Sequence, residues 1–370
     1  MTILTLLIPI LAVAPGCAAM ARAQEQPPPP PPTPAPAAAP SANPTYFNPQ
    51  IAVIGNFLGI AGHNPVDNQP SLQLRESELS LQAIVDPYAR ADFFISFSNS
   101  GVNVEEGFVT FLHLPGDLQA KVGQFRVQFG KVNTMHLHVL PWADEPLPVV
   151  NLLGGEGGWA DAGVSLSRVF ELPGDTYSDL TAQVFRGKSD GLFDAPTRGD
   201  VAFNAQYRLY RDFGDDNNVE FGASWGHGHN GTSPNGTAPD GTTTLENLHL
   251  VYRWRPLQGK PHRSFILRSE LFRSTRQQPG GLQVARGFYV SGHWQLARRW
   301  YVGGRYEFAD HADAADLRDN GYAATLTFWP SEFSQLRGEY RHRNYAGGKH
   351  ADEALFQVQF AIGAHGAHPF

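Results

Sequence analysis

The sequence has no long apolar run after its N-terminal residues and no surplus of basic residues. A membrane-spanning helix needs about 20 consecutive apolar residues, so we expect no transmembrane helix. The 28 Lys and Arg residues are outnumbered by 35 Asp and Glu residues, and no basic tract occurs. Nucleic acid is therefore not an expected partner, because binding it calls for clustered positive charge.

Catalytic motifs are also missing. The sequence contains no Gly-x-Ser-x-Gly, no His-Glu-x-x-His and no Gly-rich loop that could hold a phosphate. We therefore expect a protein that is not an enzyme and that requires no cofactor. A hydrolase built inside a barrel would need only a Ser and a His facing each other across strands, so this alternative stays open.

The N-terminal residues have the composition of a leader followed by a linker. Residues 1–23 read as a secretory signal peptide that ends in the small-x-small site Ala21-Arg22-Ala23, although a positive n-region is missing. Cleavage there would remove Cys17, the one cysteine of the chain, and its setting "APGC" lacks the Leu that usually precedes a lipidated cysteine. Residues 24–46 are proline-rich and predict a disordered linker spanning up to roughly 60–70 Å.

From residue 47 onward the sequence alternates with a period of two and shows no convincing helical periodicity. In "ELSLQAIVDPYARADFFISF", residues 78–97, one face of the hairpin is apolar and the other carries Glu78, Arg90 and Asp92. Sixteen such segments are expected: 51–60, 74–85, 88–98, 106–114, 118–129, 160–168, 179–186, 201–210, 219–225, 246–255, 264–272, 287–296, 300–308, 322–329, 333–341 and 355–363.

The connections between these segments alternate in length. Short ones such as Asp86-Pro87 and "PGD" at 115–117 are followed by longer ones, including "STRQQPGGLQVA" and "HRNYAGGKHADE". Outer-membrane barrels place short turns on the periplasmic side and long loops outside, with aromatic residues near strand ends. The pattern predicts an all-β protein, a transmembrane antiparallel β-barrel of about 16 strands over residues 47–370, in the outer membrane of a Gram-negative bacterium. A large soluble β-sandwich is disfavoured because no second apolar layer is present.

One strand end carries a family resemblance. The segment "VGQFRVQFGKVN", residues 122–133, resembles phosphate-selective O/P-type porins, which have a comparable Gly-x-Phe-x-x-x-Phe-Gly strand end before their constriction loop. The ending "FQVQFAIGAHGAHPF" is similar to a poorly characterised group of Gram-negative outer-membrane proteins described as porins or receptors. The resemblance covers about residues 48–370. It implies contact with outer-membrane lipid, passage of small hydrophilic solutes, insertion by the barrel assembly machinery and a homotrimer.

Two features bear on these implications. Phe370 is terminal, as an assembly signal requires, but His368 and Gly366 replace its usual apolar neighbours. The longest connection, residues 130–159, lies where the porin resemblance places a loop that folds into the lumen. It is rich in large apolar residues and is therefore expected to pack against the wall and narrow the passage.

Charged residues at inward positions are expected to line this passage. They are Arg90, Lys121, Arg126, Arg208, Arg253, Arg255, Arg268, Arg305, Arg337 and Arg341 on the wall, with Asp144, Glu145 and Glu156 on the loop. Acids two residues away from an arginine, as in Arg305 and Glu307, would neutralise it and merely keep the wall hydrated. Alternatively, the arginines face the loop acids across the passage and create a transverse field.

Histidine pairs give a second functional hypothesis. His136 and His138 in "MHLH", and His227 and His229 in "WGHGHN", could bind a metal ion if they converge; His365 and His368 form a third pair. The main expectation is a porin for passive diffusion, with a porin-like receptor for a metal ion or metal chelate as the alternative. A TonB-dependent receptor is disfavoured because no plug domain would fit. A structural barrel with a closed lumen is a third alternative.

Overall fold

The computed structural model describes residues 49–99, 101–234, 236, 239–256, 262–314 and 316–363. The predicted signal peptide, residues 1–23, and linker, residues 24–46, lie outside the described residues. So do His365, His368 and Phe370. The predictions made for these segments therefore stay predictions.

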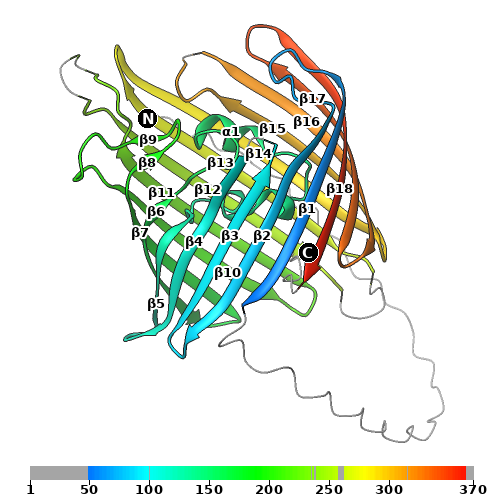
Figure 1. Cartoon of the computed structure of the whole chain (residues 1–370), viewed down its shortest axis with the longest axis horizontal. Coiled ribbons are helices and arrows are strands. Elements are labelled where there is room, and N and C mark those ends of the chain that lie inside the picture. The colour runs from blue at the N-terminus through cyan, green and yellow to red at the C-terminus, as the bar shows by residue number, and fades with distance from the viewer. Residues whose placement is uncertain are drawn as a thin grey trace, which may run out of the picture. The chain divides into compact units, whose positions relative to one another are not determined.

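The described residues form a closed barrel in which each strand pairs antiparallel with its neighbours (Figure 1). The barrel strands are β1 (Gln50–His63), β2 (Leu72–Asp86), β3 (Ala89–Ser98), β4 (Gly101–Leu114), β5 (Leu118–Arg126), β6 (Ala160–Leu172), β7 (Thr176–Phe185), β10 (Ala202–Phe213), β11 (Asn217–His229), β12 (Thr242–Trp254), β13 (Phe265–Gln278), β14 (Gly281–Ala297), β15 (Trp300–Asp310), β16 (Arg318–Ser331), β17 (Ser334–Tyr345) and β18 (Lys349–Gly363). The first and last of these, β1 and β18, close the ring. A small two-stranded sheet, β8 (Lys188–Ser189) with β9 (Phe193–Asp194), lies in the β7–β10 connection.

All sixteen predicted segments are strands of this barrel, which confirms the predicted fold class. Two predicted long connections are wrong, because the strands beside them extend further. The β13–β14 hairpin turns between Gln278 and Gly281, and the β17–β18 hairpin turns between Tyr345 and Lys349. Gly280 (φ +97°) and Gly347 (φ +78°) permit these tight turns, because glycine adopts a positive φ at little energetic cost.

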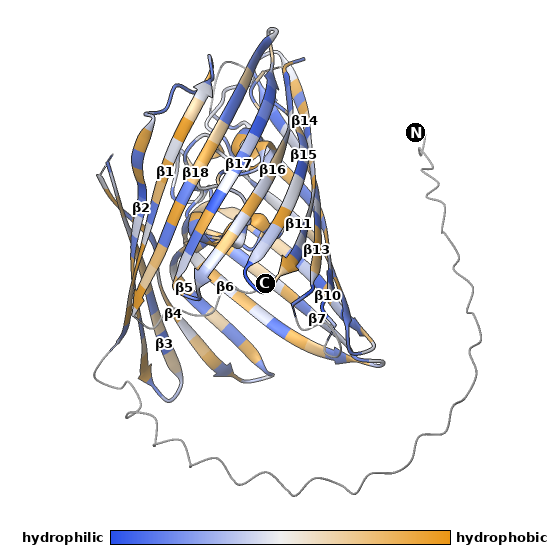
Figure 2. Ribbon diagram, turned by 90° about the vertical axis from the view of Figure 1, so that its right-hand side faces the viewer, coloured by the Kyte–Doolittle hydropathy of each residue, from blue (hydrophilic) through white to orange (hydrophobic). Residues whose placement is uncertain are grey.

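The two faces of the barrel differ as the alternation predicts, and Figure 2 shows the alternating hydropathy along the strands. Apolar side chains such as Phe203 and Leu250 are exposed on the outer face, whereas the intervening Asn204 and His249 are buried. Aromatic rings stack near the strand ends, as between Trp300 and Phe328, whose centroids lie 4.6 Å apart. The outer surface is therefore apolar and the inner surface is polar.

The interior of the barrel also contains an apolar core. Its largest fully buried side chains include Trp142, Trp159, Phe129 and Tyr289. Nearly half of this core comes from the connection between β5 and β6, residues 127–159, which we call the inner segment, and the rest comes from the wall and the β7–β10 connection. The inner segment contains two 3₁₀ turns, η1 (Val132–Thr134) and η2 (Leu137–Val139), and the helix α1 (Leu147–Leu152). Figures 1 and 2 show it inside the ring of strands.

No helix among the described residues is long and apolar enough to cross a membrane.

Candidate functional site

The two ends of the inner segment are fastened to each other by one side chain. The Nδ2 atom of Asn133 donates to the carbonyl oxygens of Val127 and Trp159, at 2.8 and 2.9 Å. The backbone N–H of Trp159 donates in return to Oδ1 of Asn133 at 2.7 Å. The buried amide thereby supplies the hydrogen bonds that the chain loses where it leaves the β5–β6 ladder.

Between these ends, the inner segment is bonded to the wall on nearly every side. The Nζ atom of Lys131 donates to Glu220 on β11 at 2.9 Å, and Glu307 on β15 accepts from the backbone N–H of Leu147 at 3.0 Å. Hydrogen bonds or ion pairs reach side chains on β2, β4, β7, β10, β11, β13, β15, β16, β17 and β18. Because these strands are distributed around the ring, the inner segment crosses the interior instead of following one wall.

Asp144 carries the densest set of ion pairs in this segment. Its carboxylate contacts Arg305 at 2.7 Å, Arg341 at 2.6 Å and Arg343 at 2.7 Å. Burial alone would raise the pKa of Asp144, but the three guanidinium groups hold it well below its usual range. The guanidinium of Arg305 also lies over the ring of Trp142, 4.9 Å from its centroid. Asp144 thus touches the arginines directly and does not face them across an open passage.

The other two acids predicted for the loop have different surroundings. Glu145 is buried and accepts a hydrogen bond from the backbone N–H of Gly157 at 2.9 Å. Burial raises the pKa of Glu145 to about 7, although Arg126 opposes that rise. Glu156 is exposed. Of the three acids, only Asp144 is ion-paired with the arginines of β15 and β17.

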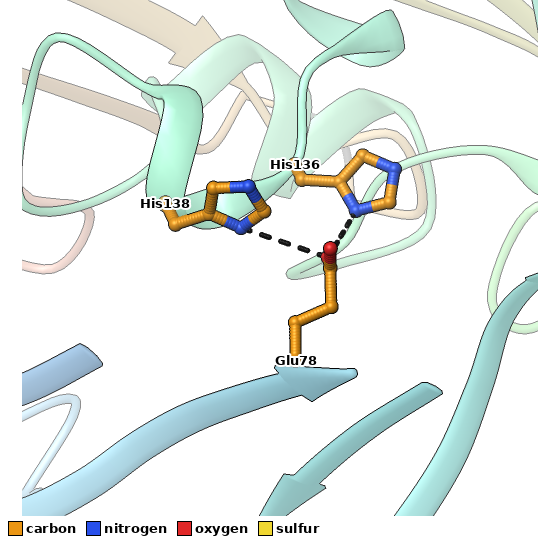
Figure 3. A group of neighbouring side chains, drawn as sticks. All are labelled: Glu78, His136 and His138. Carbon is orange, nitrogen blue, oxygen red and sulfur yellow. Dashed lines mark hydrogen bonds and ion pairs between the residues drawn. The ribbon is translucent and has the colours of Figure 1, made fainter. Parts of the chain in front are cut away.

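The first histidine pair meets a group of carboxylates, of which Figure 3 shows Glu78. The Nδ1 atom of His136 is 2.6 Å from Oε2 of Glu78 on β2, and its Nε2 atom is 2.7 Å from Oε1 of Glu106 on β4. The Nδ1 atom of His138 is 3.6 Å from Oε2 of Glu78. Burial would lower the pKa of His136, but the hydrogen bonds to Glu106 and Glu78 raise it to about 10. We call Glu76, Glu78, Glu105, Glu106, His136 and His138 the His–Glu cluster.

Two β-bulges bring this cluster together. In the β1–β2 pairing, Asn56 opposes Glu76 and Phe57 opposes Leu74, so Arg75 is the extra residue. In the β3–β4 pairing, the same kind of shift leaves Glu105 extra. A bulge turns neighbouring side chains out of strict alternation. Arg75 can therefore donate to the carbonyl oxygen of Ala143 in the inner segment.

The second histidine pair lies elsewhere. His227 is on the same face of β11 as the exposed Trp225, and the two rings stack with centroids 5.8 Å apart. His229 follows on that face and lies 3.8 Å from Asp200. The structure therefore brings His136 and His138 together but places His227 and His229 on the outer side of the barrel wall.

The predicted wall residues fall into three environments. Arg126, Arg268, Arg305, Arg337 and Arg341 are buried, whereas Arg90, Lys121, Arg208 and Arg253 are partly exposed. Arg255 lies beyond the end of β12 and is exposed. The predicted pairing two residues apart is present between Arg90 and Asp92, at 2.7 Å, and between Arg305 and Glu307, at 3.0 Å.

A polar cavity of about 210 Å³ lies between the wall and the inner segment. Gln128 of the inner segment lines it together with Lys121 on β5, Asp179 on β7 and Arg208 on β10. The charges around it have both signs. The cavity is space that the inner segment leaves on the polar side of the wall.

Several residues of the site were absent from the sequence prediction, among them Glu106, Glu353, Arg343 and Glu105. Arg343 continues the inward series of Arg337, Glu339 and Arg341, and extending the predicted strand by two residues would have found it. Glu105 points inward only because of the bulge in β4, and no period-two signal marks it.

The comparisons with known proteins place the chain among barrels. No protein-family model matches it. A protein of Aquifex aeolicus (strain VF5), described only as uncharacterized, is 30% identical over 350 residues, which cover 83% of this chain and 72% of the relative.

Three solved structures are similar in fold. The outer membrane channel DcaP of Acinetobacter baumannii has a TM-score of 0.55 at 11% identity, covering 85% of this chain and 96% of its own. OprB of Pseudomonas putida has a TM-score of 0.56 at 10% identity, and the match covers 85% of this chain and 94% of the OprB chain. OmpF of Salmonella typhi, solved with daunomycin, has a TM-score of 0.56 at 9% identity, and the match covers 85% of this chain and 97% of the OmpF chain. The fold is that of outer-membrane porins. The narrower resemblance to phosphate-selective O/P porins stays a prediction.

Proposed function

This chain belongs to the same family as the Aquifex aeolicus protein, and we propose that it is an outer-membrane porin for passive diffusion of small hydrophilic solutes or ions. The inner segment narrows the passage. The apolar outer face contacts the lipid of a Gram-negative outer membrane, the barrel assembly machinery inserts the chain, and three copies associate. Diffusion through such a barrel requires no catalysis and no cofactor.

The observation that carries this proposal is the contrast between the two faces of the closed barrel. The outer face exposes large apolar side chains, whereas the inner face carries charged and polar side chains. Lipid favours the first surface and water favours the second. The cavity beside Gln128 provides polar space next to the inner segment.

The charges and the limited space set the expected selectivity. Lys121 and Arg208 contribute positive charge to the cavity and Asp179 contributes negative charge, so we expect weak discrimination between anions and cations. The inner segment is bonded around most of the wall, and the passage it leaves suits small solutes only. The conductance should therefore be low for a barrel of this size.

A planar bilayer tests the proposal. The refolded chain should give discrete, ohmic conductance steps with a reversal potential near zero in a salt gradient. An inner-segment deletion that joins residues 130 and 155 should give larger steps. If neither protein conducts while both show the electrophoretic shift of a folded barrel, the porin proposal is refuted and a closed structural barrel replaces it.

The receptor alternative has less support. Capture of a metal ion by four converging histidines would need both pairs on one side of the wall. Because His227 and His229 lie on the outer side of β11, a receptor of that form is not proposed.

A further inference from the structure

The His–Glu cluster contains more negative charge than its surroundings neutralise. Its four carboxylates meet one nearby guanidinium, that of Arg126, which is 3.1 Å from Glu105. With neutral imidazoles the sum is −4 + 1 = −3, and with a protonated His136 imidazole it is −4 + 1 + 1 = −2, so the cluster stays negative in either state. Glu76 and Glu78 are 3% and 1% exposed, so water screens this charge poorly.

The surroundings of the Glu76 carboxylate give the strongest indication that a positively charged partner is missing from the cluster. Neither of its carboxylate oxygens has a hydrogen-bond partner among the described residues. The closest ion-pair contact of Glu76 is with Nδ1 of His138, at 3.8 Å. A buried carboxylate without a hydrogen bond is costly, and such groups are usually paired or bound to a metal ion.

The spacing of the donor atoms fits a small cation. One ligand atom each from Glu78, His136 and His138 lies within 4.8 Å of the others, and the same holds for Glu76, Glu78 and Glu105. Bonds of 2.0–2.1 Å in a tetrahedral site separate ligand atoms by about 3.4 Å. The distance of His138 Nδ1 from Glu78 is 3.6 Å, and that of His136 Nδ1 from Glu105 is 3.3 Å. The 2.6 Å contact between His136 and Glu78 must open by about 0.8 Å.

The surrounding contacts also resemble those of a metal centre. A histidine ligand commonly gives its second ring N–H to a carboxylate, which fixes its tautomer. The Nε2 atom of His136 has such a partner in Glu106 at 2.7 Å, and Glu106 also accepts from the backbone N–H of Arg126 at 3.0 Å. The backbone carbonyl of His138 accepts from Gln359 on β18 at 2.8 Å, which holds the turn in place.

We propose that His136, His138 and Glu78 bind one divalent first-row transition-metal cation, with Glu76 or Glu105 as the fourth ligand. Two imidazole nitrogens with carboxylate oxygens suit zinc and its neighbours and do not suit calcium or magnesium. The cation joins the inner segment to β2, so it fixes the position of the segment inside the barrel.

Equilibrium dialysis of the refolded, detergent-solubilised barrel against zinc chloride tests this. We expect about one zinc per wild-type chain. His138→Ala should bind zinc at least tenfold more weakly, whereas His227→Ala, on the outer side of β11, is the matched control and should bind like the wild type. A thousandfold excess of magnesium should not displace the zinc. Equal binding by the wild type and His138→Ala, or none by the wild type, would overturn the proposal.

A second variant separates ligand loss from misfolding. Glu76→Gln removes a charge that has no hydrogen-bond partner, so the variant should refold at least as well as the wild type. Its zinc affinity should fall, and the visible absorption of bound cobalt should change. Unchanged zinc affinity and an unchanged cobalt spectrum would show that Glu76 is not a ligand and leave Glu105 as the fourth. Dialysis does not depend on conductance, so this proposal and the porin proposal fail independently.

Discussion

Asp144 provides the sharpest test of how the inner segment is held. The substitution Asp144→Asn keeps the shape of the side chain and removes the charge that three arginines share. Removing one partner of a buried ion pair costs about 3–5 kcal/mol. The lower end applies here, because each arginine keeps another carboxylate: Arg305 and Arg343 keep Glu307, at 3.0 and 2.9 Å, and Arg341 keeps Glu353, at 2.5 Å.

A loss of about 3 kcal/mol is a factor of roughly 150 in the equilibrium between the docked and the released inner segment. Urea unfolding in detergent, followed by tryptophan fluorescence, reports the loss because Trp142 lies two residues before Asp144 and packs against Arg305, a partner of Asp144. Single-channel recordings should show more frequent or larger openings for Asp144→Asn than for the wild type.

Glu156→Gln is the matched control, since it removes a charge from the same segment at an exposed position. Its free energy of unfolding should lie within about 0.5 kcal/mol of the wild type. If Asp144→Asn and Glu156→Gln unfold at the same urea concentration and conduct alike, the arginine contacts do not hold the segment.

Three further predictions concern packing, pH and assembly. Trp142→Ala should lower the free energy of unfolding by about 3–5 kcal/mol because the ring is fully buried. Trp225→Ala, on the outer face, should lower it far less in detergent, and thermal unfolding of the two variants measures the difference. Glu145 has a pKa of about 7 when folded and an ordinary value of about 4.5 when unfolded, so its contribution to stability falls as pH rises from about 4.5 to 7, by about 3 kcal/mol. Urea curves at pH 5 and pH 8 should therefore differ less for Glu145→Gln than for the wild type, and equal differences would contradict the burial of this carboxyl group. Light scattering of the detergent-extracted protein should give three times the mass of one chain; a monomer mass alone would contradict the expected trimer.

The strands could be predicted from the sequence because the two surfaces of the wall face different environments. Lipid on one side and polar groups on the other impose a strict period of two, and each predicted segment followed that period. Strand ends were less clear. Beyond Phe272, the end of the predicted segment, β13 continues through the polar residues "RSTRQQ" to Gln278, where neither face is apolar and the alternation fades.

The contacts of the inner segment could be predicted only in part. Its apolar composition predicted burial, and the structure places Trp142 and Leu140 in the interior core. Its partners could not be found, because they depend on three-dimensional register. Bulges at Arg75 and Glu105 break the alternation on which the sequence reading relied. The pairing of His136 with Glu78 joins residues 58 positions apart, and no local pattern reports such a contact.

The hydrogen bonds of the inner segment have a consequence for the order of folding. Ala143 bonds to Glu339 across 196 residues of chain, and His138 bonds to Gln359 across 221. These contacts cannot form until the C-terminal strands have been made. Such distant contacts slow folding, because the chain loses conformational entropy before the contacts stabilise the structure. The apolar core around Trp142 therefore waits for nearly the whole ring. We therefore expect docking of the inner segment to be among the last steps of folding, after β17 and β18 have joined the sheet.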